Sequence, residues 1–305
     1  MISLRDVKKS FDTVKAVDGI SFQADNGIVF GLLGPNGAGK STTIKMIINI
    51  LAPDHGEILF DGSPLTEKDK SRIGYLPEER GLYKKSKVND ILLYFASLKN
   101  CAKNEAQKNI DYWLDKFELM DWKYSKASEL SKGMSQKIQF IGSIAHDPEI
   151  LFFDEPFSGL DPVSADALKE SILDLGRKGK TILFSTHIMD HAEKICTNIM
   201  IMNKGREVVS GPVEKIKSEH GNQSVTIEFD GDGSFIEKLD YVSNTITYPR
   251  YMELELKNPE YSSKLLKDCA DKIRIKKFET QAPSLHKIFI NLVGKEVLEK
   301  GENNE

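Results

Sequence analysis

"GPNGAGKS", residues 34–41, is the stretch that decides the fold of this 305-residue chain. The apolar run "GIVFGLL" at 27–33 precedes it, and an apolar stripe follows it, made by Ile44, Ile47, Ile48 and Leu51. A buried strand, a glycine-rich turn and a helix are therefore expected in succession. The stretch fits the pattern G-x-x-x-x-G-K-[ST] at each fixed position, with the residues Gly34, Pro35, Asn36, Gly37, Ala38, Gly39, Lys40 and Ser41.

The chemistry that suits this turn is phosphate binding. Backbone amides of a glycine-rich turn and of a helix N-terminus attract anions, and glycines allow the close approach and positive φ that side chains prevent. In this pattern Lys40 pairs with the β- and γ-phosphates, Ser41 ligates Mg²⁺ and Thr42 supports the phosphates. A chance glycine-rich turn is the alternative, which the flanking strand and helix disfavour. Residues 34–42 are therefore predicted to bind a nucleoside triphosphate.

Two acids end a second apolar run, "ILFFDE" at 150–155. A carboxylate is costly in such surroundings unless a cation or hydrogen bonds compensate it. Asp154, at the carboxyl edge of a sheet, is placed to hold Mg²⁺ through water. Strand alternation predicts that Glu155 points to the opposite side, where it is a candidate general base for the attacking water. The alternative is an acid pair that caps a helix before Pro156.

Composition limits the class of protein. The chain is 40% hydrophobic with a net charge of −4, which is typical of a soluble protein and argues against a nucleic-acid binder. No run approaches the roughly 18 apolar residues that cross a bilayer, and the N-terminus lacks the apolar core of a secretory signal, so a cytoplasmic location is expected. The three cysteines are scattered and are interpreted as reduced thiols.

Hydrophobic patterning predicts an α/β domain. Alternation at 2–8 and 14–23 indicates antiparallel strands, and a helical pattern occupies about 89–145. A helix is expected at 162–179, between two strand candidates. Strands separated by a crossover of this length form a parallel sheet that is buried on both faces. The remaining strand candidates are 27–33, 55–62, 71–77, 149–156 and 180–186.

The composition changes near "SEHGNQS" at 218–224. A small α+β domain is predicted at 223–295, and residues 296–305 are predicted to form a disordered tail. The expected strands of the small domain lie at 225–229, 241–247, 251–256 and 273–278, and its expected helices lie at about 260–270 and 284–293.

Three further motifs complete a family pattern: "LSKGMSQK" at 130–137, "SGLD" at 158–161 and "STH" at 185–187. Together with the two motifs above, they resemble the nucleotide-binding subunits of ABC transporters over residues 2–218. The resemblance implies a P-loop fold with a RecA-like core, an antiparallel β subdomain and a helical subdomain at about 79–145. One departure is Lys132, which replaces the first glycine of the usual LSGGQ signature.

The resemblance also implies roles for individual residues. Ser131 at a helix N-cap leaves its hydroxyl and the positive helix end free for an anion, which in the family is the γ-phosphate of ATP held by a second subunit. The residues expected to act there in trans are Ser131, Gly133 and Ser135. Asp161 resembles the residue that braces the two subunits against each other. Phe11 matches the aromatic residue that stacks on adenine, although an aromatic in a strand is more often core.

Catalysis is expected from Glu155, Lys40 and His187, the last resembling the switch histidine that contacts the γ-phosphate and supports Glu155. His191 follows four residues later, but a zinc pair is rejected because no third ligand is visible. The expected Mg²⁺ ligands are Ser41, Glu78 and Asp154. Glu78 stands where most ABC subunits have a glutamine. A glutamate adds negative charge there, so metal affinity or hydrolysis rate can differ.

The function expected from this resemblance is ATP hydrolysis that drives transport through a separate membrane permease. The chain would pair with a second copy or a related ATPase subunit and lie at the inner face of the cell membrane, without nucleic acid. The stretch "GYLPEERGLY" (74–83) is similar to subunits for sodium efflux or drug and peptide export. The alternatives are an ABC ATPase of ribosomes, which usually has two cassettes, a DNA-repair ABC ATPase, which has a long insertion, and a small-molecule kinase.

Overall fold

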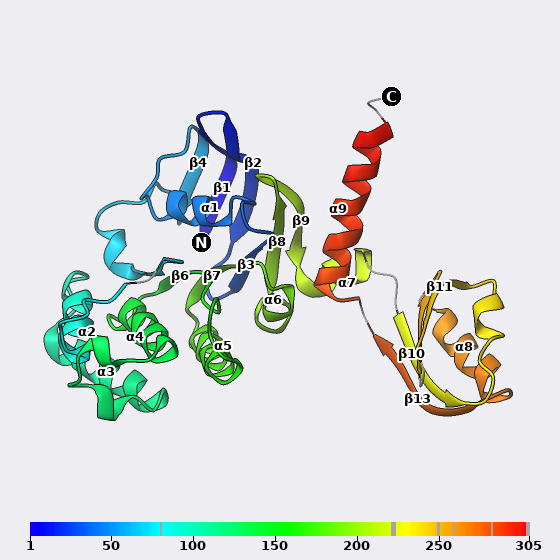
Figure 1. Cartoon of the computed structure of the whole chain (residues 1–305). Helices are drawn as coiled ribbons and strands as arrows, with labels where there is room; N and C mark the ends of the chain where they lie inside the picture. Colours follow the sequence, from blue (N-terminus) through cyan, green and yellow to red (C-terminus); the bar gives the residue numbers. More distant parts are fainter. Residues whose placement is uncertain (80, 221–223, 249–250, 259, 282, 303–305) are drawn as a thin grey trace. The chain divides into compact units, whose positions relative to one another are not determined.

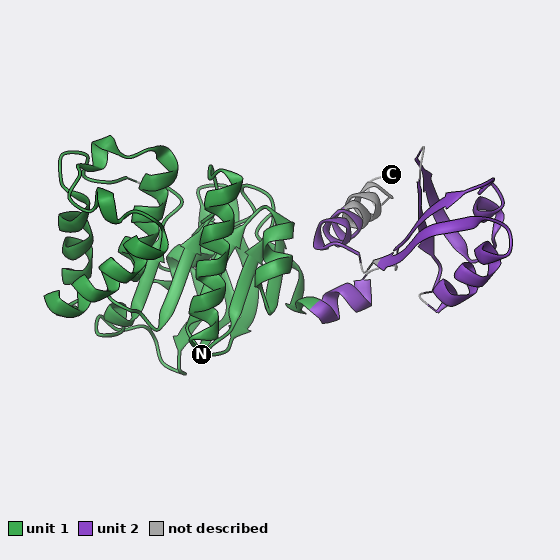
Figure 2. Cartoon of the chain, turned by 90° about the horizontal axis from the view of Figure 1, so that it is seen from below, with its two compact units in different colours: residues 1–213 green, residues 214–305 purple. Residues whose placement is uncertain are grey.

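The computed structural model describes residues 1–79, 81–220, 224–248, 251–258, 260–281 and 283–302. These residues form two compact units, 1–213 and 214–305 (Figures 1 and 2). The predicted boundary at 218 lies inside the helix α7 (Val213–His220), so the division comes slightly earlier than the sequence suggested.

A six-stranded sheet forms the centre of the first unit, in the order β5-β6-β7-β3-β8-β9. Neighbouring strands are parallel except for β9, which is antiparallel to β8. The predicted parallel sheet is therefore confirmed, and β8 and β9 were not predicted. The strands are β3 (Val29–Leu33), β5 (Ile73–Leu76), β6 (Ile150–Asp154), β7 (Thr181–Thr186), β8 (Asn198–Asn203) and β9 (Arg206–Pro212).

A three-stranded antiparallel sheet packs beside the central sheet, as predicted from the alternation near the N-terminus. It consists of β1 (Ile2–Phe11), β2 (Val14–Ala24) and β4 (His55–Phe60). The helix α1 (Lys40–Ile47) lies between the two sheets, and its Ile44 and Ile47 share one buried core with both. The start of α1 is thereby held at the end of β3.

Helices α5 (Pro162–Arg177) and α6 (Met189–Ile195) lie on the opposite face of the central sheet from α1 (Figure 1). The start of α5 is well defined locally. Asp161 is its N-cap and accepts a hydrogen bond from the Ser164 amide at 2.9 Å, and Pro162 occupies the first helical position.

Three helices lie within the stretch predicted as a helical subdomain: α2 (Val88–Ser97), α3 (Lys103–Lys116) and α4 (Lys132–Ile144). An aromatic cluster joins α3 and α4 to the sheet. The fully buried Phe140 of α4 lies 6.0 Å from Trp113 and 5.8 Å from Phe117 between ring centroids, and 5.2 Å from Phe153 of β6. These contacts fix α4 against the strand that carries the two acids.

The second unit contains an antiparallel sheet in the order β11-β12-β10-β13 with α8 (Tyr261–Ala270) against it. Its core is separate, and includes Val225, Ile227, Leu254 and Leu265. The predicted α+β character is therefore present in this unit. Its strands are β10 (Ser224–Asp230), β11 (Val242–Thr247), β12 (Tyr251–Leu256) and β13 (Arg274–Gln281).

The last helix, α9, spans Leu285–Glu302 and extends beyond the predicted helix at 284–293. The predicted disordered tail at 296–305 is therefore wrong through Glu302, and residues 303–305 lie outside the described part of the chain. The segment "KEVLEK" (295–300) consists mostly of good helix formers, which explains the continuation. Short 3₁₀ turns occur at Asp69–Arg72, Met120–Trp122, Ala127–Glu129 and Ile236–Lys238.

Across the described residues, none of the helices combines the length and the apolar character that a membrane span requires.

Phe140→Ala is expected to lower the free energy of unfolding of the first unit by about 3–5 kcal/mol, because it opens a cavity between three aromatic rings. Urea unfolding followed by tryptophan fluorescence measures this loss, since both tryptophans, Trp113 and Trp122, lie in the helical region. Tyr124→Ala, at a side chain that is 66% exposed, serves as control and should cost less than about 0.5 kcal/mol. Equal losses in the two variants would contradict the bridging role of Phe140.

Candidate functional site

Residues 34–41, here called the phosphate loop, connect the end of β3 to the start of α1. Gly34 has a φ of 147°, and a Cβ there would lie 2.2 Å from the Met202 carbonyl oxygen. Gly39 has a φ of 102°, and its Cβ would lie 2.3 Å from the Ala16 carbonyl oxygen. Neither position admits a side chain, so the sequence pattern is explained by the tight course of the backbone around the start of α1.

Lys40, the first residue of α1, has partners on three sides. Its Nζ donates to the carbonyl oxygens of Gly34 at 2.8 Å and Pro35 at 3.1 Å. It also lies 3.3 Å from Oε1 of Glu155, and the two side chains are only 5% and 6% exposed. Two buried opposite charges compensate each other here, whereas either one alone would be strongly unfavourable.

Asp154 lies fully buried at the end of β6, within reach of two hydroxyl groups. Oγ of Ser41 donates to its Oδ1 at 2.9 Å, and Oγ of Ser185 donates to the same oxygen at 2.5 Å. The parallel pairing of β6 and β7 places Asp154 directly opposite Ser185. No role was predicted for Ser185 from the motifs, although its position at the end of a neighbouring parallel strand is the signal that identifies it.

The predicted Mg²⁺ ligands come together and suit a hard cation. Oδ2 of Asp154 is buried without a hydrogen-bond partner among the described residues, and Oε2 of Glu78 lies 3.5 Å from Oγ of Ser41. Two carboxylates and a hydroxyl are the oxygen donors that Mg²⁺ prefers, with water completing its shell. The donor set therefore fits the expected metal.

Glu155 does not point away from Asp154, and that prediction is wrong. Its φ of 48° takes the chain out of the strand, so simple alternation no longer applies. Its amide donates to Oγ of Ser185 at 2.9 Å, and its Oε2 lies 2.9 Å from Nδ1 of His187. The carboxylate thus faces Lys40 on one side and His187, whose side chain is 42% exposed, on the other.

The start of α4 forms a separate part of the site. Ser131 is its N-cap, as the sequence indicated, and its hydroxyl oxygen accepts the Met134 amide at 3.2 Å, which leaves the hydroxyl hydrogen able to donate to an anion. A Cβ on Gly133 would lie 3.3 Å from Oδ2 of Asp161, which places residues 131–135, here called the signature turn, beside the start of α5. Ser131 is exposed, and Ser135 is partly exposed on the same turn.

The other two predicted residues lie at the margins of these clusters. Phe11 is the last residue of β1 and is 47% exposed, so its ring is not part of the core. Asp161 caps α5, and its hydrogen bonds to the Ser164 backbone and hydroxyl hold the pKa of its carboxyl below the ordinary value.

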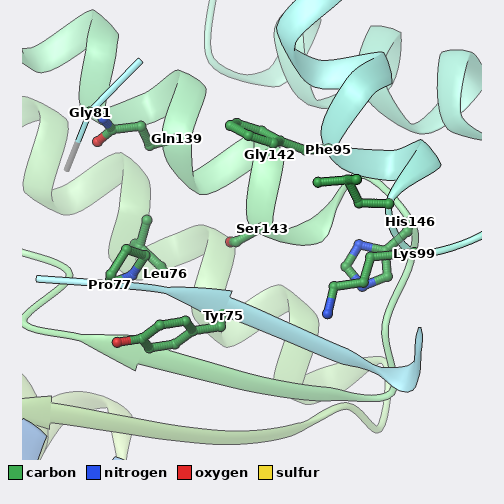
Figure 3. Close-up of a pocket in the computed structure, with 11 residues that line it drawn as sticks. Tyr75, Leu76, Pro77, Gly81, Phe95, Lys99, Gln139, Gly142, Ser143 and His146 are labelled. Carbon is green, nitrogen blue, oxygen red and sulfur yellow. The ribbon is translucent and has the colours of Figure 1, made fainter. Parts of the chain in front are cut away.

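A largely apolar cavity of about 330 Å³ opens between β5, α2 and α4 (Figure 3). Burial, with smaller contributions from Asp154 and Glu78, raises the pKa of Tyr75 in its wall to about 12. Burial also lowers the pKa of His146 to about 4, so this ring is neutral near pH 7. The cavity is lined by Tyr75, Leu76, Pro77, Gly81, Phe95, Leu98, Lys99, Gln139, Gly142, Ser143 and His146.

The two histidines of the rejected zinc pair lie in different surroundings. His187 precedes α6, whereas His191 lies within it and packs against Phe157 at 4.6 Å between ring centroids. Within the part of the chain that the structure describes, no three histidine, cysteine or acidic side chains gather as a metal cluster.

Two family models match this sequence. The one described as "ABC transporter" matches residues 17–158, which contain the phosphate loop, the signature turn and both buried acids. The one described as the C-terminal domain of DrrA1-3-like ATP-binding proteins matches residues 211–293.

Several proteins resemble the chain over most of its length. An uncharacterised ABC transporter ATP-binding protein, YhaQ of Bacillus subtilis, is 44% identical over 96% of this chain and 99% of its own. NatA, an ABC transporter ATP-binding protein of the same organism, is 35% identical over 75% of this chain and 96% of its own. A solved structure described as the ATP-binding subunit of an ABC transporter superposes with a TM-score of 0.66 at 31% identity, over 72% of this chain and 92% of the other.

Lys40→Ala is expected to weaken binding of an ATP analogue about 10- to 100-fold, because it removes a charge-assisted contact to the phosphates. Lys45→Ala, an exposed lysine on the same helix, is the matched control. Isothermal titration calorimetry with non-hydrolysable ATP measures both affinities. Unchanged affinity in Lys40→Ala would refute the assignment of the phosphate loop.

Proposed function

Because this chain belongs to the family of ABC transporter ATP-binding proteins, which hydrolyse ATP to power transport, we propose that it drives a separate membrane permease of the export type. The observation that carries this proposal is the convergence of Lys40, Ser41, Asp154, Glu155 and His187 at the start of α1. These side chains come from the ends of two strands, β6 and β7, and from one helix, and together they supply a cation, a metal-binding group and a base.

We infer that Lys40 and the backbone amides of the phosphate loop bind the β- and γ-phosphates of ATP. The ammonium exchanges its carbonyl and carboxylate partners for phosphate oxygens. Asp154, Ser41 and Glu78 would hold Mg²⁺, which supplies charge compensation for the phosphates when bound. The exposed ring of Phe11 is placed at a strand end where an adenine base can stack on it.

Glu155 is the proposed general base. Once Lys40 turns to the phosphates, the carboxylate retains His187 at 2.9 Å and can accept a proton from the attacking water. Its strained φ is maintained by the hydrogen bond from its amide to Ser185. His187 orients the carboxylate and, being partly exposed, can also reach the γ-phosphate.

A second ATPase subunit completes each site in this proposal. The exposed Ser131 and the glycine after Lys132 lie at a helix N-terminus, which attracts negative charge. In a head-to-tail dimer this turn would contact the γ-phosphate held by the other chain, and Asp161 would lie at the contact. The subunits separate once the γ-phosphate has been released.

The cavity between β5, α2 and α4 is the proposed docking place for the permease, through a short apolar helix. Exposed apolar side chains surround it, namely Leu98 at 60%, Tyr83 at 57% and Tyr94 at 47%. The charges of Asp154 and Glu78 contribute to the raised pKa of Tyr75 in the wall of this cavity. A permease helix that fills the cavity would therefore contact a residue next to the metal ligands.

The export type rests on the names of relatives that match nearly the whole chain. These include the linearmycin resistance ATP-binding protein LnrL of Bacillus subtilis, at 29% identity over 97% of this chain, and a Nod factor export ATP-binding protein of Burkholderia thailandensis, at 32% over 97%. The second unit matches a domain named for DrrA-like proteins. We propose an amphipathic organic compound as the class of cargo.

Glu155→Gln is expected to retain ATP binding, to reduce hydrolysis at least 100-fold, and to accumulate as an ATP-bound dimer, because the base is lost while the phosphate contacts stay. Size-exclusion chromatography with light scattering detects the dimer, and phosphate release measures the rate.

Glu170→Gln, an exposed acid on α5, is the control and should hydrolyse ATP at the parent rate. A monomeric Glu155→Gln chain at saturating ATP would overturn the dimer, and an undiminished rate would overturn the base assignment.

Leu98→Glu is expected to abolish co-purification with the permease, because it introduces a charge into an apolar contact. Leu266→Glu, at a 40% exposed leucine of α8, is the matched control. Affinity capture of the membrane protein encoded beside this chain, followed by its detection in the eluate, provides the measurement. Equal capture by both variants would exclude the cavity as the docking place.

A further inference from the structure

The first turns of α4 contact the loop at 158–161 of the same chain, and two observations define this contact. Nε2 of Gln136 donates to the Ser158 carbonyl oxygen at 2.8 Å. Lys132 lies one helical turn earlier on the same face of α4, and its Nζ would be 2.9 Å from a Cβ placed on Gly159. The helix end proposed to serve a second subunit is thus tied to a loop within its own chain.

This loop follows directly after Glu155. The Ser158 amide donates to the Glu155 carbonyl oxygen at 3.1 Å, which closes a tight turn across Pro156 and Phe157. Phe157 is buried and packs at 4.6 Å from His191 and 6.0 Å from Phe184 between ring centroids. The backbone of Ser158 is therefore linked directly to the backbone of Glu155 by this hydrogen bond.

Gln136 is poorly explained by stability alone. Its Nε2 is bonded, but its Oε1 is buried without a hydrogen-bond partner among the described residues. An unsatisfied buried acceptor is unfavourable, and an apolar side chain of the same length would avoid that cost. Methionine matches glutamine in length and has neither the amide donor nor the amide oxygen.

We propose that Gln136 is a positioning residue that links the two nucleotide sites of the dimer. Gln136 holds the loop at 158–161, and therefore Glu155 of its own chain, in a fixed position relative to the signature turn. That turn contacts the nucleotide bound by the other chain. ATP bound against Ser131 of one chain therefore favours the productive orientation of Glu155 in that chain. This inference rests on the proposed function, because it requires a dimer with shared sites.

Mixed dimers of two differently tagged chains separate an effect within the chain from one across the dimer. They are assembled on ATP without Mg²⁺, purified over both tags and started by adding Mg²⁺. In the first dimer one chain carries both Gln136→Met and Glu155→Gln, and its partner is unchanged. In the second, one chain carries Gln136→Met and the other carries Glu155→Gln. Each dimer retains a single intact Glu155.

The second dimer is expected to hydrolyse its ATP about 10- to 100-fold more slowly than the first, because only there does the remaining Glu155 share a chain with the substitution. Equal rates, or a slower first dimer, would overturn the proposed role of Gln136. The proposal of a dimer with shared sites would still stand. Failure to isolate any mixed dimer would instead overturn the proposed function, and the two-site link with it.

Two further measurements exclude a merely structural effect. Gln136→Met is expected to keep the Tm of the parent chain within about 2 °C and to lower kcat without raising the KM for ATP. Gln107→Met is the matched control, since this residue of α3 also donates through Nε2, to Asn89 at 3.0 Å and Asp111 at 2.9 Å. A kcat loss that is equal in both variants, or a large drop in Tm for Gln136→Met, would contradict a positioning role.

Discussion

The ion pair between Lys40 and Glu155 is the interaction on which the rest of the site depends. Two neighbouring carboxylates, Asp154 and Glu155, lie buried at the end of β6, where unpaired charges are strongly disfavoured. The start of α1 supplies one cation and one hydroxyl, and β7 supplies a second hydroxyl through Ser185. The sheet order, with β6 beside β7 and β7 beside β3, brings these groups to one edge. Parallel strands make such an arrangement possible because their carboxyl ends lie side by side.

Much of this arrangement could be predicted from the sequence, because its motifs have strict local requirements. The phosphate loop needs glycines at fixed positions, and the apolar run before Asp154 indicates a buried strand. The predictions failed where geometry departs from regular elements. The positive φ of Glu155 turns its side chain back toward Lys40, and strand alternation contains no information about that turn. The N-cap role of Ser131, by contrast, agrees with its prediction, because a serine before a helical pattern is itself a local signal.

Other features escaped prediction because they depend on distant parts of the chain. Ser185 contacts Asp154 only because of the register between β6 and β7. Tyr75 has a raised pKa because it lies buried in the cavity wall, near the charges of Asp154 and Glu78. Strands β8 and β9 were missed, although the turn at Lys204 and Gly205, both with positive φ, is a typical hairpin signal. The helix α9 extends through a charged segment that composition alone suggested to be disordered. Composition therefore proved a weaker guide than residue-level helix propensity in that segment.

The engagement of Lys40 by Gly34, Pro35 and Glu155 has a consequence for the resting protein. Lys40 and Glu155 are both almost completely buried, so the proposed binding of a triphosphate would replace the carboxylate partner of the ammonium group with phosphate oxygens. On that proposal, nucleotide binding would exchange one anion for another and would free the Glu155 carboxylate to accept a proton from water. Nucleotide binding and release of the proposed base would then be coupled through competition for one positive charge.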